Sequence, residues 1–273
     1  MIRRIPPVFK ERPWGAEDVG PWFPPRGVRT GEVWFQTEPP LPLLAKFIFT
    51  SERLSVQVHP NDAEARERGL ENGKTEMWHV LRAKPGATLA LGFRMAIDAG
   101  QARAAALSGA IVDLLDWAPA RAGDTFFVPA GTVHAIGAGL AICEIQQNSD
   151  TTFRLFDYGR GRPLHLEDGL AVARLTPREP QPQPRLAAAP WTQVARCEYF
   201  VTEIAELETA WMHPASEDEF KLLVVLEGSG RIDGQQYRAG ECWLAGPGTE
   251  GFAVDPETPT RMLRSGPPRG LVS

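Results

Sequence analysis

The chain has 273 residues, of which 43% are hydrophobic and 23% charged, and its formal net charge is −5. This length can bury a sizeable core in one large domain or two small ones, and the acidic balance argues against a broad nucleic-acid-binding surface. The N-terminal stretch MIRRIPPVFK lacks the apolar run of a secretory signal, and no segment reaches the roughly 20 apolar residues of a membrane helix. We therefore expect a cytoplasmic protein with neither nucleic acid nor membrane as a partner.

Short apolar runs rich in Val, Ile, Phe and Trp, separated by glycines and prolines, predict the strands of a sandwich or barrel. Two stretches, 98–117 and 164–175, predict helices instead, because their apolar residues recur at a spacing of three to four. The predicted fold class is therefore mainly β with a few short helices. In chain order the predicted strands are LLAKFIF (43–49), LSVQVH (54–59), EMWHVL (76–81), TFFVPA (125–130), AICEIQQ (141–147), FKLLVVL (220–226) and ECWLAG (241–246).

A repeated pattern predicts two copies of one β unit. GDTFFVPAGTVH (123–134) contains the string Gly-x5-Pro-x-Gly-x2-His, and GECWLAGPGTEG (240–251) keeps this spacing but ends on glycine in place of histidine. The proline-rich stretch between the copies predicts a linker. The predicted parts are a metal-binding catalytic domain over 1–175 with a helical insert around 98–117, a linker over 176–190, and a second, ligand-depleted domain over 191–273.

Four side chains of the first copy predict a metal site. Residues two apart on a strand point to the same face, so Gln57 and His59 project together, and Ser55 lies on the same face. Glu76 begins another predicted strand, and His134 follows a tight Pro-x-Gly turn. Zinc suits two imidazoles, a carboxylate and an amide, and iron or manganese can take the same ligands. We predict one divalent cation, assigned as zinc, although the spacing does not decide among these metals.

The same motifs resemble a known family. The string Gly-x5-Pro-x-Gly-x2-His marks a cupin barrel, and LSVQVHPND, GKTEMWHVL, VPAGTVHAIG and EIQQNSDTTFRLFDYGR look like the zinc-dependent type I mannose-6-phosphate isomerases in their short bacterial form. The resemblance covers most of residues 9–175, including KERPWG and GEVW, and fades afterwards. It implies two cupin units of the jelly-roll type and an isomerase that interconverts mannose 6-phosphate and fructose 6-phosphate through a cis-enediol.

The resemblance also implies roles for individual residues. The family's zinc ligands fall on the four residues named above, and its catalytic positions fall on Lys74, Glu144 and Arg154. Glu144 is the first choice for the base that moves the proton, and Arg154 would add positive charge where the enediolate forms. Lys46 and Ser55 match positions proposed to hold the phosphate of a sugar phosphate substrate. The loop FQTEPPLP (35–42) is shorter than the family pattern, so the resemblance does not define which segment covers the site.

Two other readings remain open at this point. The residue types also suit an iron-dependent cupin oxygenase, which uses two histidines and one carboxylate, and a cupin that binds metal and sugar without turnover. A fourth ligand at Gln57 and the string around Arg154 disfavour the oxygenase. The sequence leaves open whether the chain is a monomer or a dimer.

Overall fold

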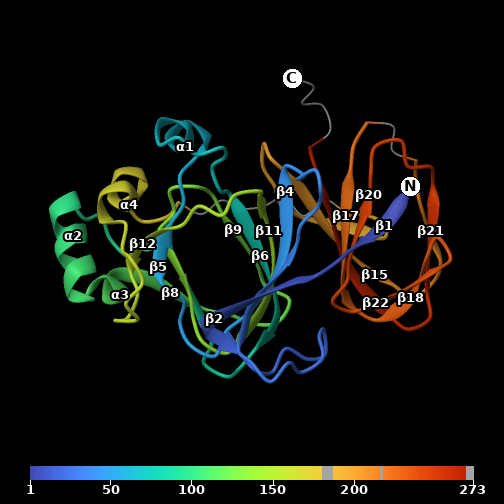
Figure 1. The fold of residues 1–273 in the computed structure, drawn as a ribbon, viewed down its shortest axis with the longest axis horizontal. Coiled ribbons are helices and arrows are strands. Elements are labelled where there is room, and N and C mark those ends of the chain that lie inside the picture. Colours follow the sequence, from blue (N-terminus) through green and yellow to red (C-terminus); the bar gives the residue numbers. More distant parts are fainter. Residues whose placement is uncertain (180–186, 216–217, 269–273) are drawn as a thin grey trace.

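The computed structural model describes residues 1–179, 187–215 and 218–268. Within these residues the chain is mainly β with a few short helices, which confirms the predicted fold class. The strands of the described ranges form four antiparallel sheets, none of which closes into a barrel by hydrogen bonds. Figure 1 shows the sheets as successive layers along the long axis of the molecule, with the helices at one end.

The first half of the chain supplies two facing sheets. In spatial order, the six-stranded sheet contains β2 (Val8–Ala16), β3 (Thr30–Phe35), β4 (Leu43–Phe49), β11 (Leu140–Gln147), β6 (Glu76–Ala83) and β9 (Thr125–Val128). The five-stranded sheet contains, in order of hydrogen-bonded neighbours, β12 (Phe153–Phe156), β5 (Val56–Val58), β10 (His134–Ile136), β7 (Thr88–Phe93) and β8 (Leu115–Pro119).

The second half supplies two further sheets. The seven-stranded sheet contains β1 (Ile2–Ile5), β20 (Cys242–Ala245), β17 (Lys221–Glu227), β22 (Thr260–Gly266), β15 (Val201–Leu207), β14 (Trp191–Arg196) and β13 (Ala187–Ala188). The four-stranded sheet contains β16 (Trp211–His213), β21 (Phe252–Pro256), β18 (Ser229–Ile232) and β19 (Gln235–Arg238). The first strand of the chain, β1, thus pairs with β20 of the second unit.

The central strands of the six-stranded sheet are buried on both faces, which explains the nearly continuous apolar sequences of β4 and β11. Ile48 points into the interior of the first unit, whereas Phe47, on the opposite face, packs toward the seven-stranded sheet. Leu222 and Val224 of β17 belong to the same cluster as Phe47, so one core joins the two units. A strand whose two faces are both covered can be apolar throughout.

Three helices cover the outer face of the five-stranded sheet: α2 (Ala99–Ser108), α3 (Ile111–Leu114) and α4 (Leu166–Val172). The remaining helix, α1 (Asp62–Glu67), follows β5 in the chain. Val56 and Val58 of β5 pack on this outer side together with Ala106 and Ile111. Because side chains alternate along a strand, Gln57 is left on the inner face, between the two sheets of the first unit.

The helical stretch predicted over 98–117 is helical as far as Leu114 but is broken into two helices, and its last three residues form a strand instead. Asp98 caps α2 by a capping box, but the helix ends at Gly109, whose φ of 85° is left-handed. After the short α3 the chain continues as a strand from Leu115, which pairs with Phe93. The apolar spacing alone did not distinguish this last segment from helix.

The predicted boundary between the domains remains a prediction. Part of the expected linker over 176–190 falls on residues 180–186, which lie outside the described residues. Of the remainder, Pro177 forms a bridge with Phe93, and β13 begins at Ala187. No helix in the described ranges is long and apolar enough to cross a membrane.

The interior of the second unit is filled by large side chains. Trp191, Trp243 and Met262 are almost fully buried there, and the ring of His213 stacks on Phe252 with their centroids 4.6 Å apart. Among the described residues, the one group of His, Cys, Asp or Glu close enough to hold a metal lies in the first unit.

We expect the shared core to make the two units unfold together. Phe47→Ala removes a buried ring at their junction and should lower the free energy of unfolding by about 3–5 kcal/mol. Leu107→Ala, at an exposed helical position, should change it by less than about 0.5 kcal/mol. Urea unfolding followed by tryptophan fluorescence measures both. Two separate transitions, with only one of them shifted by Phe47→Ala, would contradict this expectation.

Candidate active site

One row of polar side chains lies on the inner face of the five-stranded sheet. Gln57 of β5 is paired with His134 of β10 on one side and with Arg154 of β12 on the other. Directly opposed residues of neighbouring strands point to the same side of a sheet. Three predicted site residues from distant parts of the sequence therefore line up and face the six-stranded sheet.

A second row lies on the facing sheet. Glu144 of β11 is paired with Lys46 of β4 and with Trp78 of β6. Glu76 is two residues before Trp78 and shares its face. The two rows bring a set of cations, carboxylates and imidazoles into the space between the sheets.

The structure brings the four predicted metal ligands together. His59 Nε2 lies 3.7 Å from Glu76 Oε2, and His134 Nε2 lies 3.6 Å from Glu76 Oε1. The side-chain amide of Gln57 lies 3.1 Å from His134 Nε2. These separations are close to the roughly 3.3 Å that separates ligands in a tetrahedral site with bonds of about 2.0–2.1 Å. Ser55 Oγ donates to Gln57 Oε1 at 3.1 Å, and a hydroxyl can hold that amide in either orientation.

Both histidines present an unprotonated nitrogen to this group. The Nδ1 atom of His59 donates to the Thr151 carbonyl at 2.9 Å, and that of His134 donates to the Thr132 carbonyl, also at 2.9 Å. Burial lowers the pKa of His59 well below its usual value and that of His134 to about 4. The rings are therefore neutral near pH 7, with Nε2 available as a ligand atom.

Glu76 supplies the negative charge of the group. The residue is fully buried, and neither carboxylate oxygen accepts a well-aligned hydrogen bond from the described residues. Lys74 Nζ lies 2.8 Å from Glu76 Oε2 and 3.2 Å from His59 Nε2. Burial and the neighbouring Glu144 raise the pKa of Glu76 to about 7, against the opposing effect of Lys74. A buried carboxylate without aligned hydrogen bonds is costly, and a divalent cation among these donors would satisfy it.

Glu144 lies beside this group and is also buried. Trp78 Nε1 donates to Glu144 Oε2 at 3.0 Å, and Lys46 Nζ lies 3.4 Å from Glu144 Oε1. Burial alone would raise the pKa of Glu144, but Lys74 and Lys46 outweigh it and lower the pKa below its usual value. Glu144 is thus ionised near pH 7. Lys46 does not reach outward to solvent, since it is buried and lies over the ring of Trp34.

A cavity of about 500 Å³ opens above these residues. All five residues predicted to act on or bind a substrate line it, together with Gln57. It also contains residues for which the sequence predicted no role; some of them lie in quoted motifs, Arg12 in KERPWG and Glu32 in GEVW, but no metal-like spacing marked them. The full set of charged or imidazole-bearing lining residues is Glu11, Arg12, Glu32, Lys46, Lys74, Glu144, Asp150, Arg154, Arg162 and His165.

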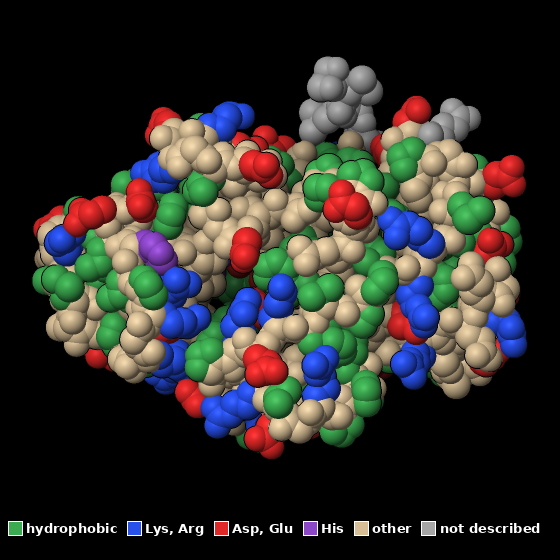
Figure 2. Space-filling view, viewed as in Figure 1, with side chains coloured by type: hydrophobic (Ala, Val, Ile, Leu, Met, Phe, Trp, Pro, Cys, Tyr) green, Lys and Arg blue, Asp and Glu red, His purple; other side chains and the backbone are tan. Residues whose placement is uncertain are grey.

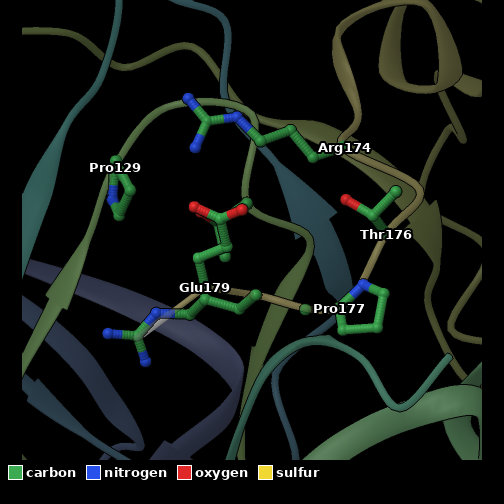
Figure 3. A pocket seen from close by; sticks show the side chains of 8 residues that line it. Pro129, Arg174, Thr176, Pro177 and Glu179 are labelled. Atoms are coloured by element: carbon green, nitrogen blue, oxygen red, sulfur yellow. The ribbon is translucent and has the colours of Figure 1, made fainter. Parts of the chain in front are cut away.

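A second, smaller cavity of about 270 Å³ lies behind the turn that carries His134. Pro129 and Thr132 of that turn line it, and Figure 3 shows Arg174 and Glu179 extending into it. It holds none of the predicted catalytic, substrate or metal residues. The candidate active site is therefore the cavity of about 500 Å³ that contains those residues.

Comparisons with known proteins place the chain in a family. A mannose-6-phosphate isomerase of Streptococcus mutans is 37% identical over 204 residues, which are 70% of this chain and 62% of that protein, so the match spans less than two thirds of its length. A mannose-6-phosphate isomerase of Bacillus subtilis is 33% identical over 279 residues, covering 85% of this chain and 87% of that protein. No protein-family model matches the sequence.

Solved structures share the fold. The crystal structure of a mannose 6-phosphate isomerase from Bacillus subtilis superposes with a TM-score of 0.85 at 24% identity, covering 96% of this chain and 98% of that one. A mutant phosphomannose isomerase from Salmonella typhimurium gives a TM-score of 0.76 at 15% identity, covering 97% and 99%. On the evidence of the sequence relatives, the chain belongs to the mannose-6-phosphate isomerase family.

Proposed function

We propose that this protein interconverts mannose 6-phosphate and fructose 6-phosphate with the help of a bound divalent cation. The observation that carries the proposal is the buried group of His59, Glu76 and His134 below a cavity that also contains Lys74 and Glu144. Membership of the isomerase family favours this activity over an iron-dependent oxygenase or a cupin that binds sugar without turnover.

Zinc is the cation we assign to the site, held by Gln57, His59, Glu76 and His134. Support comes from the donor set: two neutral imidazoles fixed by backbone carbonyls, and a carboxylate without aligned hydrogen bonds. When bound, the cation would act as a Lewis acid toward a sugar oxygen.

The protein's own side chains suit the transfer of a proton between neighbouring carbons. Isomerisation through a cis-enediol needs a group that takes a proton from one carbon and returns it to the next. Glu144 is ionised, borders the cavity, and is held in place by Trp78, so we propose it as this base. Lys74, within 4.0 Å of Glu144 and 2.8 Å of Glu76, would stabilise negative charge on the substrate oxygens.

The remaining predicted roles stay predictions. Ser55 donates to Gln57, so one of its contacts is to a proposed metal ligand. Lys46 pairs with Glu144, which couples it to the proposed base. Arg154 lines the cavity one strand away from Gln57.

Removal of the metal should abolish the activity. Protein treated with a chelator and then dialysed should no longer convert mannose 6-phosphate, because the charges of the empty site cannot polarise the sugar. Formation of fructose 6-phosphate, followed through a coupled dye assay, measures this, and added Zn²⁺ should restore it. Full turnover by protein shown by elemental analysis to be free of metal would contradict the proposal, as would oxygen consumption during the reaction.

The two buried carboxylates should respond differently to loss of charge. Glu144→Gln keeps the shape of the side chain but removes the base, so kcat should fall by about 10²–10⁴-fold while zinc stays bound. Glu76→Gln removes the only carboxylate of the metal group and should lower zinc content as well as turnover.

Elemental analysis and the coupled assay on both variants test this pair. Loss of zinc from Glu144→Gln, or near-normal kcat in that variant, would remove Glu144 from the role of base. Retention of zinc by Glu76→Gln at wild-type affinity would remove Glu76 from the ligand set.

A further inference from the structure

Two arginines in the smaller cavity have no part in the proposed function. Figure 2 shows basic and acidic side chains interspersed over one face of the protein, so an exposed arginine by itself indicates no binding site. Arg174 and Arg178 differ because both line the cavity of about 270 Å³ behind the turn that carries His134. Neither has a carboxylate of the described residues within ion-pair distance, although Asp116 acts on Arg178 from farther away. Guanidinium groups that share a cavity and lack ion-pair partners attract an anion.

The chain around Arg178 holds this residue at the cavity. Pro177 forms a bridge with Phe93 of β7, and a Cβ added to Gly92 would lie only 3.0 Å from the Cβ of Arg178. Burial lowers the pKa of Arg178 from its usual value, against the opposing effect of Asp116. Its Nε atom is shielded from solvent and has no hydrogen-bond partner among the described residues. A partly desolvated guanidinium that no protein acceptor completes gains more from a bound anion than one in water.

The remaining polar residues of the cavity limit the kind of anion. Thr132 and Thr176 add hydroxyl groups, whereas Glu179 adds a carboxylate, which Figure 3 shows extending into the cavity together with Arg174. The charged side chains of the lining are therefore two cations and one anion. Guanidinium groups bind the oxygens of carboxylates and phosphates in pairs, and the volume is at the lower end of the range for ligand pockets. These features suit a small oxyanion.

The turn before His134 is shared by this cavity and the metal group. Thr132 lines the cavity, and its carbonyl accepts the Nδ1 proton of His134 at 2.9 Å. The backbone N–H of Arg174 donates to the Gly131 carbonyl at 2.8 Å, and the N–H of Gly131 donates to the His59 carbonyl at 2.8 Å. Two proposed metal ligands are thus held by a turn that lies against the cavity.

We propose that Arg174 and Arg178, with Thr132 and Thr176, bind a small oxyanion at a site separate from the active-site cavity, and that the bound anion stabilises the turn before His134. The anion is a phosphate or a small carboxylate, since both present the same oxygens to a guanidinium. Anion binding does not depend on the proposed function, whereas the effect on the metal group rests on it. If the anion stabilises the arrangement that binds the metal, each ligand must strengthen the binding of the other.

Titration with inorganic phosphate and, separately, with succinate tests the site and distinguishes the two kinds of anion. Isothermal titration calorimetry on the full-length, metal-loaded protein should detect binding of at least one probe. Arg174→Gln and Arg178→Gln should each weaken this binding by about tenfold. Arg121→Gln, at an exposed arginine that does not line the cavity, should change it by less than about twofold. A probe bound in the active-site cavity contributes equally to all these proteins, so the comparison isolates the smaller cavity.

Glu179→Gln should have the opposite effect. The substitution removes a like charge and leaves both arginines in place, so the affinity for the bound probe should rise by about threefold or more. A damaged fold would not tighten binding, which separates this result from misfolding. Weaker binding in Glu179→Gln would overturn the proposed site. So would the absence of binding of either probe at about 10 mM, or binding that survives both arginine substitutions.

The effect on the metal group has its own measurement. The rate at which an excess of a chromogenic chelator removes zinc should fall by about threefold when the bound probe is saturating, and this effect should vanish in Arg178→Gln. Equal rates with and without the probe in the wild type would overturn the coupling between the two sites. If the protein bound the probe through both arginines yet never formed fructose 6-phosphate, the anion site would stand and the proposed function would fail.

Discussion

A buried carboxylate without aligned hydrogen bonds sets the main constraint on the first unit. Glu76 lies between two sheets, in a place where an isolated charge is strongly disfavoured. Its stability as a carboxylate therefore depends on the groups around it. Lys74 supplies the opposite charge in contact with it, whereas the unprotonated Nε2 atoms of His59 and His134 point lone pairs toward its two oxygens, an arrangement that a cation between them would stabilise. His59 and His134 come from other parts of the sequence than Glu76, so the sheets must keep their register for these ligand atoms to converge. The register that brings these ligand atoms together is therefore one that a bound cation would stabilise.

The same arrangement separates two kinds of electrostatic environment in one cavity. At the floor, ammonium groups and carboxylates are paired at short distance and out of contact with solvent, so their protonation states are fixed by one another. Elsewhere in the lining, the guanidinium groups of Arg154, on the end strand β12 of the five-stranded sheet, and of Arg162, in the loop after it, remain partly exposed. Proton transfer between carbons, as proposed above, suits the first environment, where water is largely excluded.

Much of the candidate site could be predicted from the sequence because it follows strand periodicity. The spacing of Gln57 and His59, and the turn before His134, are local patterns whose geometry is the same in any sheet. The pairing of Lys46 with Glu144 is not local. It depends on β4 lying beside β11, and no pattern in either segment predicts that these two strands are neighbours. The place of Arg162 in the cavity lining could not be predicted for a related reason. Arg162 lies in an irregular loop, where sequence spacing does not determine direction.

The fold shows the same division between local and long-range information. The strands were recognisable from composition and turns, whereas the end of α2 depended on one left-handed glycine and the strand after it on a partner in β7. The position of β1 had no local signal, since IRRI pairs with a strand about 240 residues later, as the Arg4 and Trp243 pairing shows.

The late synthesis of the strands that cover the first unit has a consequence for folding on the ribosome. A ribosome delivers the N-terminal half first, and until β17, β20 and β22 emerge, the face of the six-stranded sheet that carries Phe47 and Cys143 has no covering layer. The nascent chain therefore exposes an aggregation-prone apolar surface through much of its synthesis, and this surface is buried when the last sheet forms. The C-terminal half, which has no metal site among its described residues, would thus cover the apolar face of the half that contains the candidate active site.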